Sequence, residues 1–213
     1  MNSHDTRTIQ LIMALRSKGI RDAQVLSAIE RIPRDLFVSQ AFTGQAFEDT
    51  ALPIECGQTI SQPFIVAYMT ERLQVGPRHK VLEVGTGSGY QGAVLSLLCR
   101  RLYTMERYRP LLKQAEQRFA QLDLHNITTL LGDGLKGWPE QAPFDRIMVT
   151  AAGYDVPSHL ADQLAVGGHM VVPVGHEGDQ MIVHVTRNET GFETEHLLSV
   201  RFVPLVEGIA QER

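Results

Sequence analysis

The spacing of apolar residues changes partway along the chain, and the change separates two predicted regions. In the first region, apolar residues recur at helical spacing over residues 7–18 and again after Asp22, which predicts two helices, the second capped by Asp22. Pro33 suits the first turn of a short helix, PRDLFV. Residues 42–58 show no regular pattern, which predicts a loop with short extended pieces. Ser61 is predicted to cap a third helix. The buried face of that helix would carry Ile65, Val66, Met69 and Leu73.

In the second region, short apolar runs alternate with helical segments. Each run predicts a buried strand, and the runs are KVLEVG, RLYTME, ITTLLGD, FDRIMVTAA and HMVVPVG. Helices are predicted between them over residues 90–99, 109–122 and 157–164. Such alternation implies right-handed crossovers and a parallel sheet with helices on both faces. After Gly175 two strand-like segments follow without a helix, so the sheet is expected to finish with antiparallel pairing. These segments are DQMIVHVTRN and ETEHLLSVRFVPL.

Together the elements predict an α/β fold: a doubly wound, mostly parallel Rossmann-like sheet with an antiparallel final strand, plus an N-terminal helical extension. The chain has 213 residues, 43% of them hydrophobic, and no Pro-, Ser- or Gly-rich linker divides it. A single domain over residues 1–213 is therefore expected, with residues 1–75 as helices and a segment covering the site, and residues 76–213 as the α/β core. The formal net charge of −4 argues against a general nucleic-acid binder, because phosphate contact needs concentrated Lys and Arg.

The cysteines, the histidines and the N-terminal segment bear on the compartment of the protein and on metal binding. Cys56 and Cys99 are too few for a disulfide framework, which fits a reducing compartment. The start, MNSHDTRTIQ, lacks the basic and apolar regions of a signal peptide, and no apolar run approaches the ~20 residues of a membrane helix. A cytoplasmic protein without membrane contact is therefore expected. No histidine pairs with Cys, Asp or Glu at metal-ligand spacing, so no metal is predicted.

The strongest local signal is a glycine-rich turn after the first predicted strand. Glu83, Gly85, Thr86 and Gly87 begin the sequence EVGTGSG, in which an acid inside the strand is followed by three alternating glycines. In open α/β sheets, ligands bind beyond the carboxyl ends of strands, where glycines let the backbone approach the ligand. A dinucleotide fingerprint would place its third Gly or Ala where Tyr90 stands, so that motif fails.

Two further carboxylates end the next two predicted strands. Glu106 follows the glycine turn by about 20 residues, a spacing that suits acceptance from two ribose hydroxyls. Asp133 could accept from an adenine amine, with Gly134 letting the base lie against the backbone. Alternatively, Glu106 pairs with a neighbouring arginine and Asp133 is a turn residue. Carboxylates repel phosphates, so a ligand with a ribose, a base and a positive centre fits best, as in S-adenosylmethionine.

These residues resemble the first motifs of class I methyltransferases, which share the sheet predicted above. The flanking segments are more specific, and they resemble the protein-L-isoaspartate O-methyltransferase family. They are ALPIECGQTISQP, GQTISQPFIVAYMTE, GDGLKGWPEQAPFDRIMVTAA, VVPVGHEGDQ and VRFVPL. The likeness covers most of residues 20–208. It implies methyl transfer from S-adenosylmethionine to isoaspartyl carboxylates in damaged proteins and peptides.

The resemblance also implies a role for each site residue. Thr59, Ile60 and Ser61 would line the place where methyl donor meets carboxylate, with Ser61 as the family's active-site serine, although a cap role alone is the alternative. The cofactor would be held by Glu83, Gly85, Thr86, Gly87, Glu106, Asp133 and Gly134. The peptide would be flanked by Ala151, Ala152, Val203, Pro204 and Leu205. Some family members have His after the proline of TISQP, whereas here Phe64 follows it.

The implied chemistry needs no general base, because an α-type carboxylate with a pKa of roughly 3.5 is already ionised at neutral pH. A methyltransferase for a small-molecule carboxylate is the rival enzyme. A nucleic-acid amine methylase usually carries an (N/D/S)-PP-(Y/F) segment where this chain has Thr150-Ala151-Ala152-Gly153. A cofactor-binding regulator without catalysis is the rival from another class. A monomer is the default expectation.

Overall fold

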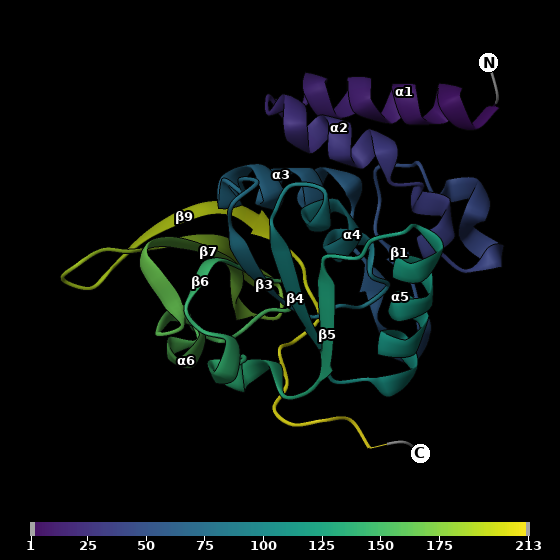
Figure 1. Ribbon diagram of the computed structural model, residues 1–213. Coiled ribbons are helices and arrows are strands. Elements are labelled where there is room, and N and C mark those ends of the chain that lie inside the picture. The colour runs from purple at the N-terminus through teal and green to yellow at the C-terminus, as the bar shows by residue number, and fades with distance from the viewer. Residues whose placement is uncertain (1–2, 212–213) are drawn as a thin grey trace.

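The computed structural model describes residues 3–211, and a seven-stranded sheet forms its centre (Figure 1). The strands lie in the order β5-β4-β3-β6-β7-β8-β9. The first five in this order are parallel, β8 is antiparallel to β7, and β9 is antiparallel to β8. The strands are β3 (Lys80–Val84), β4 (Arg101–Glu106), β5 (Ile127–Leu131), β6 (Phe144–Val149), β7 (Leu164–His176), β8 (Asp179–Arg187) and β9 (Phe192–Val200). The predicted doubly wound sheet with a final antiparallel strand is confirmed.

The order of the strands reverses at β3. The chain moves from β3 through β4 to β5 on one side, and then returns to β6 on the other side of β3. At such a reversal the connections leave in opposite directions, which opens a crevice beyond the carboxyl ends of the strands. The glycine turn that follows β3 therefore stands at the point where a ligand is expected.

Six α-helices are described, and five short 3-10 segments join the elements. The helices are α1 (Ser3–Ser17), α2 (Ala23–Arg31), α3 (Pro63–Leu73), α4 (Tyr90–Ser96), α5 (Arg109–Gln121) and α6 (Ser158–Ala161). The 3-10 segments are η1 (Arg34–Phe37), η2 (Gln40–Gln45), η3 (Glu55–Gly57), η4 (Gly134–Lys136) and η5 (Pro139–Gln141). A separate two-stranded ribbon pairs β1 (Leu52–Pro53) with β2 (Thr59–Ile60). Among residues 3–211, no helix is both long and apolar enough to cross a membrane.

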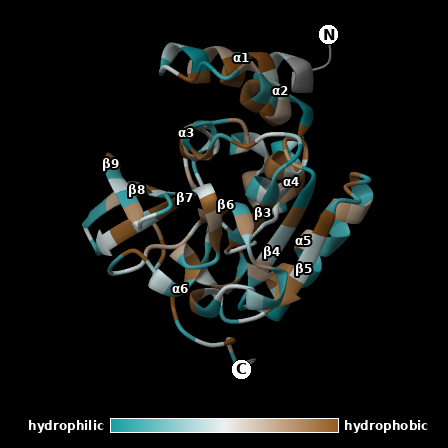
Figure 2. Ribbon diagram, turned by 60° about the vertical axis from the view of Figure 1, so that its left-hand side comes forward, coloured by the Kyte–Doolittle hydropathy of each residue, from teal (hydrophilic) through white to brown (hydrophobic). Residues whose placement is uncertain are grey.

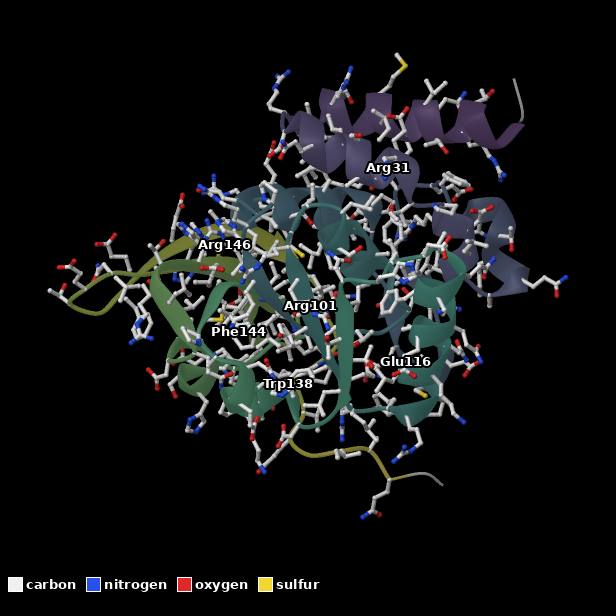
Figure 3. The ribbon with its side chains drawn as sticks, viewed as in Figure 1. Arg31, Arg101, Glu116, Trp138, Phe144 and Arg146 are labelled. Carbon is white, nitrogen blue, oxygen red and sulfur yellow. The ribbon has the colours of Figure 1, made fainter. Side chains whose placement is uncertain are left out.

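Alternate residues of the strands pack on opposite faces of the sheet. Val81 and Leu102 belong to the cluster that α3 and α4 cover, whereas Leu82 and Val84 face α6 and the loop around Trp138. On that second face the ring of Tyr103 meets the rings of Trp138 and Phe144 edge-on, at 5.4 and 5.8 Å. Trp138 and Phe144 are labelled in Figure 3. Both faces of the central strands are thus buried, as the continuous apolar runs predict.

The N-terminal helices α1 and α2 lie over α3 and α4 (Figure 2). Leu15 and Ile29 from these helices join one buried cluster with Ala93 of α4 and Phe119 of α5. The side chain of Asp22 accepts from the backbone amides of the first turn of α2, so the predicted cap is confirmed. The helical extension is therefore anchored on the same core that carries the glycine turn.

Several predictions about element ends are wrong. The helix predicted over 157–164 is limited to α6, and strand β7 already begins at Leu164. Helix α3 is preceded by Gln62 at the cap position, without a side-chain cap bond, so Ser61 is not its cap. Helix α4 ends at Ser96, where the side-chain amide of Asn126 binds the Ser96 carbonyl at 2.8 Å and removes it from the helical ladder. The last strand ends at Val200, because Phe202 N donates to the side chain of Gln180 and the following residues leave the sheet.

Candidate functional site

Residues 85–89 form a tight turn between β3 and α4. Gly85, Gly87 and Gly89 have positive φ values of 97°, 53° and 90°, which L side chains rarely adopt. Space is also limiting at Gly85, because a Cβ there would lie 2.3 Å from Oγ1 of Thr150. That hydroxyl donates to the Gly85 carbonyl at 2.7 Å and so joins the turn to the end of β6. The alternating glycines in the sequence therefore reflect backbone geometry.

Glu106 ends β4 and is 6% exposed. Its Oε2 accepts from the backbone N–H of Gly87 at 2.8 Å. Its Oε1 accepts from the amides of Arg107 and Tyr108 at 2.8 and 3.0 Å. A carboxylate offers about four lone-pair sites, so one site on Oε2 is left for a ligand hydroxyl. Glu106 thus fixes the glycine turn and can still contribute an acceptor to the cavity.

Glu83 lies beneath the turn and lines no cavity of the site. It is completely buried, and its Oε2 accepts from the hydroxyl of Thr104 at 2.6 Å. That hydroxyl also lies 2.7 Å from Oγ1 of Thr86, which links the acid to the turn. Burial raises the pKa of Glu83 to about 8, while the Thr104 hydrogen bond lowers it and the charge of Glu106 raises it. The structure therefore places Glu83 as a support behind the turn.

Asp133 and Gly134 follow β5 and stand at the edge of the site. Oδ1 of Asp133 accepts from Leu135 N at 3.0 Å and caps η4. Gly134 is buried, and a Cβ there would lie 2.5 Å from Cγ1 of Val84. The backbone of Gly134 therefore packs directly on the end of β3, where a side chain would not fit.

The segment Thr59–Ser61 reaches the site from the small ribbon. Thr59 is exposed and Ile60 is buried against the N-terminal cluster. Within residues 3–211 the hydroxyl of Ser61 has no protein hydrogen-bond partner. The start of α3 is held by Asp49, whose Oδ1 accepts from the backbone amide of Phe64 at 2.8 Å. The ring of Phe64 packs beside Tyr68, with centroids 5.8 Å apart.

The C-terminal segment crosses the carboxyl end of β6. Ala152 N donates to the Val203 carbonyl, and Leu205 N donates to the Ala152 carbonyl, both at 2.8 Å. Farther on, Nε of Arg107 donates to the Gly208 carbonyl at 3.1 Å. These bonds fix the course of residues 203–208 past the end of β6 and past Arg107.

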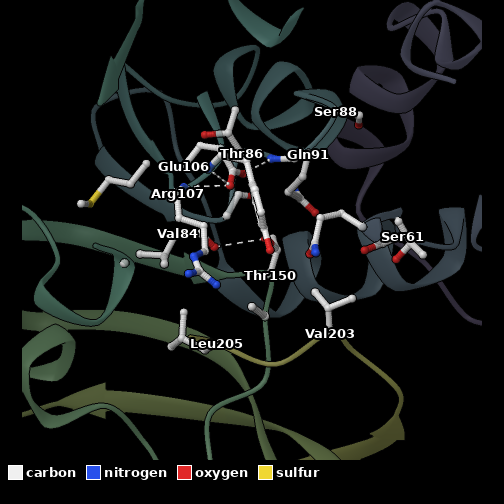
Figure 4. A pocket seen from close by; sticks show the side chains of 18 of the residues that line it. Ser61, Val84, Thr86, Ser88, Gln91, Glu106, Arg107, Thr150, Val203 and Leu205 are labelled. Carbon is white, nitrogen blue, oxygen red and sulfur yellow. Dashed lines mark hydrogen bonds between the residues drawn. The ribbon is translucent and has the colours of Figure 1, made fainter. Parts of the chain in front are cut away.

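Two cavities adjoin along this course. The first, at the turn, is lined by the predicted residues Thr59, Ile60, Ser61, Gly85, Thr86, Gly87, Glu106, Gly134, Ala151, Val203, Pro204 and Leu205 (Figure 4). The second, of about 1750 Å³, includes the predicted residues Asp133 and Ala152. Both cavities share Thr59, Ser61, Val203, Pro204, Leu205 and Val206. Ser61 and Val203 lie on one side of the first cavity and Arg107 on the other (Figure 4).

Several residues that line the first cavity were not predicted from the sequence. They are Gln58, Val66, Ser88, Tyr90, Gln91, Arg107, Tyr108, Thr150 and Val206. The neighbours of Glu106 could have been found, since residues after a strand's carboxyl end turn toward the crevice. Tyr90 and Gln91 had no such signal, because the sequence predicted residues 90–99 only as a helix between two strands. Among the described residues, no three His, Cys, Asp or Glu side chains gather as metal ligands would.

The reversed strand order, the glycine turn and the carboxylate that ends β4 define a class I S-adenosylmethionine-dependent methyltransferase. The residues fit such a cofactor, because Glu106 keeps an acceptor site and Gly134 contributes bare backbone to the wall of the cavity. The family model described as protein-L-isoaspartate(D-aspartate) O-methyltransferase matches residues 6–210. The chain belongs to this family.

Individual relatives agree with the family match. The chain is 63% identical to a protein-L-isoaspartate O-methyltransferase of Parvibaculum lavamentivorans, over 100% of this chain and 97% of the relative. It is 59% identical to that of Paramagnetospirillum magneticum over 100% of both chains. A solved protein-L-isoaspartate O-methyltransferase superposes with a TM-score of 0.86 at 27% identity, covering 95% of this chain and 67% of that one. A Plasmodium falciparum structure in complex with S-adenosyl-L-homocysteine shares the fold, with a TM-score of 0.82 at 23% identity, over 97% of this chain and 99% of that one.

Proposed function

We propose that the chain transfers the methyl group of S-adenosylmethionine to the free carboxylate of L-isoaspartyl residues in damaged proteins and peptides. The observation that carries the proposal is the shared boundary of the two cavities at Thr59, Ser61 and the C-terminal segment. A donor in the first cavity and a carboxylate in the second would meet at that boundary. Esterification of this carboxylate begins repair, since the ester can collapse to a succinimide whose hydrolysis returns some normal aspartate.

The cofactor, when bound, supplies an electrophilic methyl group. Glu106 would accept from its ribose, and the turn at Gly85, Thr86 and Gly87 would approach it through backbone atoms. Asp133 and Gly134 would hold the base between a carboxylate and bare main chain. Glu83 would act from behind the turn, through its hydrogen bond with Thr104.

Catalysis in this site rests on orientation. The isoaspartyl carboxylate is already an anion near neutral pH, so no proton needs to be removed from it. Ser61 would donate its unpartnered hydroxyl to one carboxylate oxygen and leave the other facing the methyl donor. Ile60, Val203 and Leu205 would limit water at the meeting point, which favours a reaction in which opposite charges combine. Alignment of this kind contributes about 7–11 kcal/mol in favourable models.

The size of the second cavity favours a polypeptide over the rival small-molecule carboxylate. At about 1750 Å³ it exceeds the roughly 300–1,000 Å³ typical of small-molecule sites. Ala151, Ala152 and the segment from Val203 through Pro204 to Leu205 would flank an extended peptide at its entrance. The exposed side chain of Tyr154, which lies beside His176, belongs to the same cavity and offers an apolar surface.

A turnover assay tests the proposal with three acceptors and labelled S-adenosylmethionine. An isoaspartyl peptide should be methylated, the same peptide with normal aspartate should not, and free dicarboxylic acids should react far more slowly. The aspartyl peptide is the matched control, because it differs only in which carboxylate is free. Preference for a free dicarboxylic acid would favour the rival reading, and absence of any transfer would favour a binding protein.

We also propose that the protein works as a monomer in the cytoplasm and acts without nucleic acid or membrane. Both cysteines are free thiols, Cys56 exposed and Cys99 buried, which suits a reducing compartment. Sedimentation at several concentrations tests the monomer, and a constant mass near 23.7 kDa is expected. A mass that doubles with concentration would contradict it.

A further inference from the structure

Arg34 is a buried arginine outside both cavities. It lies in η1, only 1% of its surface is exposed, and it is among the largest fully buried side chains. Arginine is seldom buried without a carboxylate partner, because a charged group loses its hydration there. Burial accordingly lowers the pKa of Arg34, although nearby Tyr90 and Asp49 oppose the shift. Burying the Arg34 guanidinium therefore costs desolvation free energy, and a role at this position would explain why the residue is an arginine.

The contacts of Arg34 join the N-terminal region to the boundary between the cavities. Its Nη2 donates to the Ser61 carbonyl at 2.8 Å and lies 3.4 Å from the Thr50 carbonyl. Its guanidinium stacks over the ring of Tyr90, 4.8 Å from the ring centroid, and Tyr90 lines the first cavity. Nε and Nη1 have no hydrogen-bond partner in the described part of the chain. The side chain thus provides the Ser61 carbonyl with a hydrogen bond, while two of its own nitrogens, Nε and Nη1, remain without one.

The Ser61 carbonyl lies between strand β2 and helix α3, so neither the strand nor the helix binds it in a regular hydrogen-bond ladder. Strand β2 ends at Ile60, and the ladder of α3 begins with Val66 N bonded to the Gln62 carbonyl. The peptide between them could rotate without a partner held in place. A planar guanidinium is suited to hold it, because it can stack on an aromatic face and donate sideways at the same time.

We propose that Arg34 is a positioning residue for methyl transfer: it packs its guanidinium on Tyr90 and donates to the Ser61 carbonyl, and so fixes the Thr59–Ser61 segment at the boundary of the two cavities. Arg34 lines neither cavity, so it acts through the lining residues that it contacts: chiefly Ser61 and Tyr90, and Thr50 at the longer distance of 3.4 Å. The inference rests on the proposed role of Ser61 in orienting the isoaspartyl carboxylate.

Arg34→Met tests the proposal, because methionine keeps length and apolar packing but removes the donor and the charge. We expect kcat on an isoaspartyl peptide to fall about tenfold or more, since small misplacements near reacting atoms cost up to about 10²-fold. The Kd for S-adenosylmethionine should change by less than about threefold, as Glu106 and the glycine turn are untouched. Arg34→Lys keeps one charged donor and should recover part of kcat. Arg31→Met, an exposed neighbour at the end of α2, is the matched control (Figure 3).

A double-mutant cycle with Ser61→Ala separates positioning from support of the fold. If Arg34 acts through Ser61, the double variant should be no slower than Ser61→Ala alone, whereas independent effects would multiply. Normal kcat in folded Arg34→Met, multiplying effects, or failure of both Arg34 variants to fold would each overturn the inference. Parent-like kcat in Ser61→Ala would instead overturn the proposed role of Ser61, so the two failures are distinguishable.

Discussion

Glu106 binds the main chain of Gly87: its Oε2 accepts from the Gly87 amide at 2.8 Å, across the 19 residues that separate them in sequence. Its Oε1 meanwhile binds the two amides that follow it. One side chain thereby sets both the shape of the glycine turn and the start of the segment after β4. A ligand hydroxyl bound by Glu106 would therefore be coupled to the conformation of the turn.

Glu106→Ala should weaken cofactor binding strongly, because it removes a charged acceptor and also releases the glycine turn. A hydrogen bond to a charged group contributes about 1.5–3 kcal/mol, which corresponds to roughly a 10- to 150-fold rise in Kd. Calorimetric titration with S-adenosylmethionine measures the change. Glu106→Gln, which keeps the shape but accepts at only one atom, should lie between alanine and parent. Parent-like affinity in both would remove Glu106 from the ribose site.

Gly134→Ala should damage the cavity through the backbone. The new Cβ would lie 2.5 Å from Cγ1 of Val84, a buried side chain of the central strand, so the main chain at 134 must move. We expect weaker cofactor binding and a lower melting temperature. Gly44→Ala is the control, because nothing lies within 4 Å of its Cβ position. Equal behaviour of the two variants would contradict the close approach at Gly134.

The raised pKa of Glu83 should make the free energy of unfolding depend on pH. Its pKa is about 8 in the folded protein, raised by burial, against 4.5 as the ordinary value. Between these values the folded protein holds a proton that the unfolded chain has released, so the contribution of Glu83 is full below about pH 4.5 and is lost as pH rises to about 8. Glu83→Gln cannot ionise and lacks this loss.

The measurement is urea unfolding of parent and Glu83→Gln between about pH 5 and pH 8. The free energy of unfolding of the variant should gain on that of the parent as pH rises across this window. A constant difference would show that Glu83 is ionised in the folded protein throughout. Thr104→Val serves as a control, since it removes the hydroxyl that donates to Glu83 without removing the titrating group.

Much of the fold could be predicted from the sequence because periodicity reports burial. Strands buried on both faces, such as β3, appear as continuous apolar runs, and the Asp22 cap is a local signal. Element ends were harder, since distant side chains decide them. The side chain of Asn126 binds the last carbonyl of α4, and the side chain of Gln180 accepts from the backbone amide of Phe202 just beyond β9. Neither contact leaves a trace in local spacing.

The residues of the candidate site also fall into two groups: those that a sequence motif predicts and those that only contacts between distant residues reveal. Motif residues at strand ends, such as Glu106 and Gly134, do lie around one cavity, because topology alone brings strand ends together. Glu83 was expected to hold the cofactor, but the alternation of β3 directs its side chain toward Gly92 of α4, and it lines neither cavity. Arg34 could not be recognised, since its neighbours Ser61 and Tyr90 are 27 and 56 residues away and only the fold unites them.

The last prediction concerns Ser61, whose hydroxyl is unpartnered in the described chain and whose predicted cap position belongs to Gln62. If the hydroxyl orients the substrate carboxylate, Ser61→Ala should lower kcat on an isoaspartyl peptide about tenfold or more, and each factor of ten is about 1.4 kcal/mol of transition-state stabilisation. Melting temperature should stay close to that of the parent, because no cap bond is lost, whereas loss of a true cap costs about 1 kcal/mol. Ser39→Ala, at an exposed serine without a side-chain cap bond, is the matched control. Measuring kcat, cofactor Kd and melting temperature on one preparation decides the matter: parent-like kcat would remove Ser61 from the catalytic residues, and a loss of stability without a loss of turnover would restore a structural role.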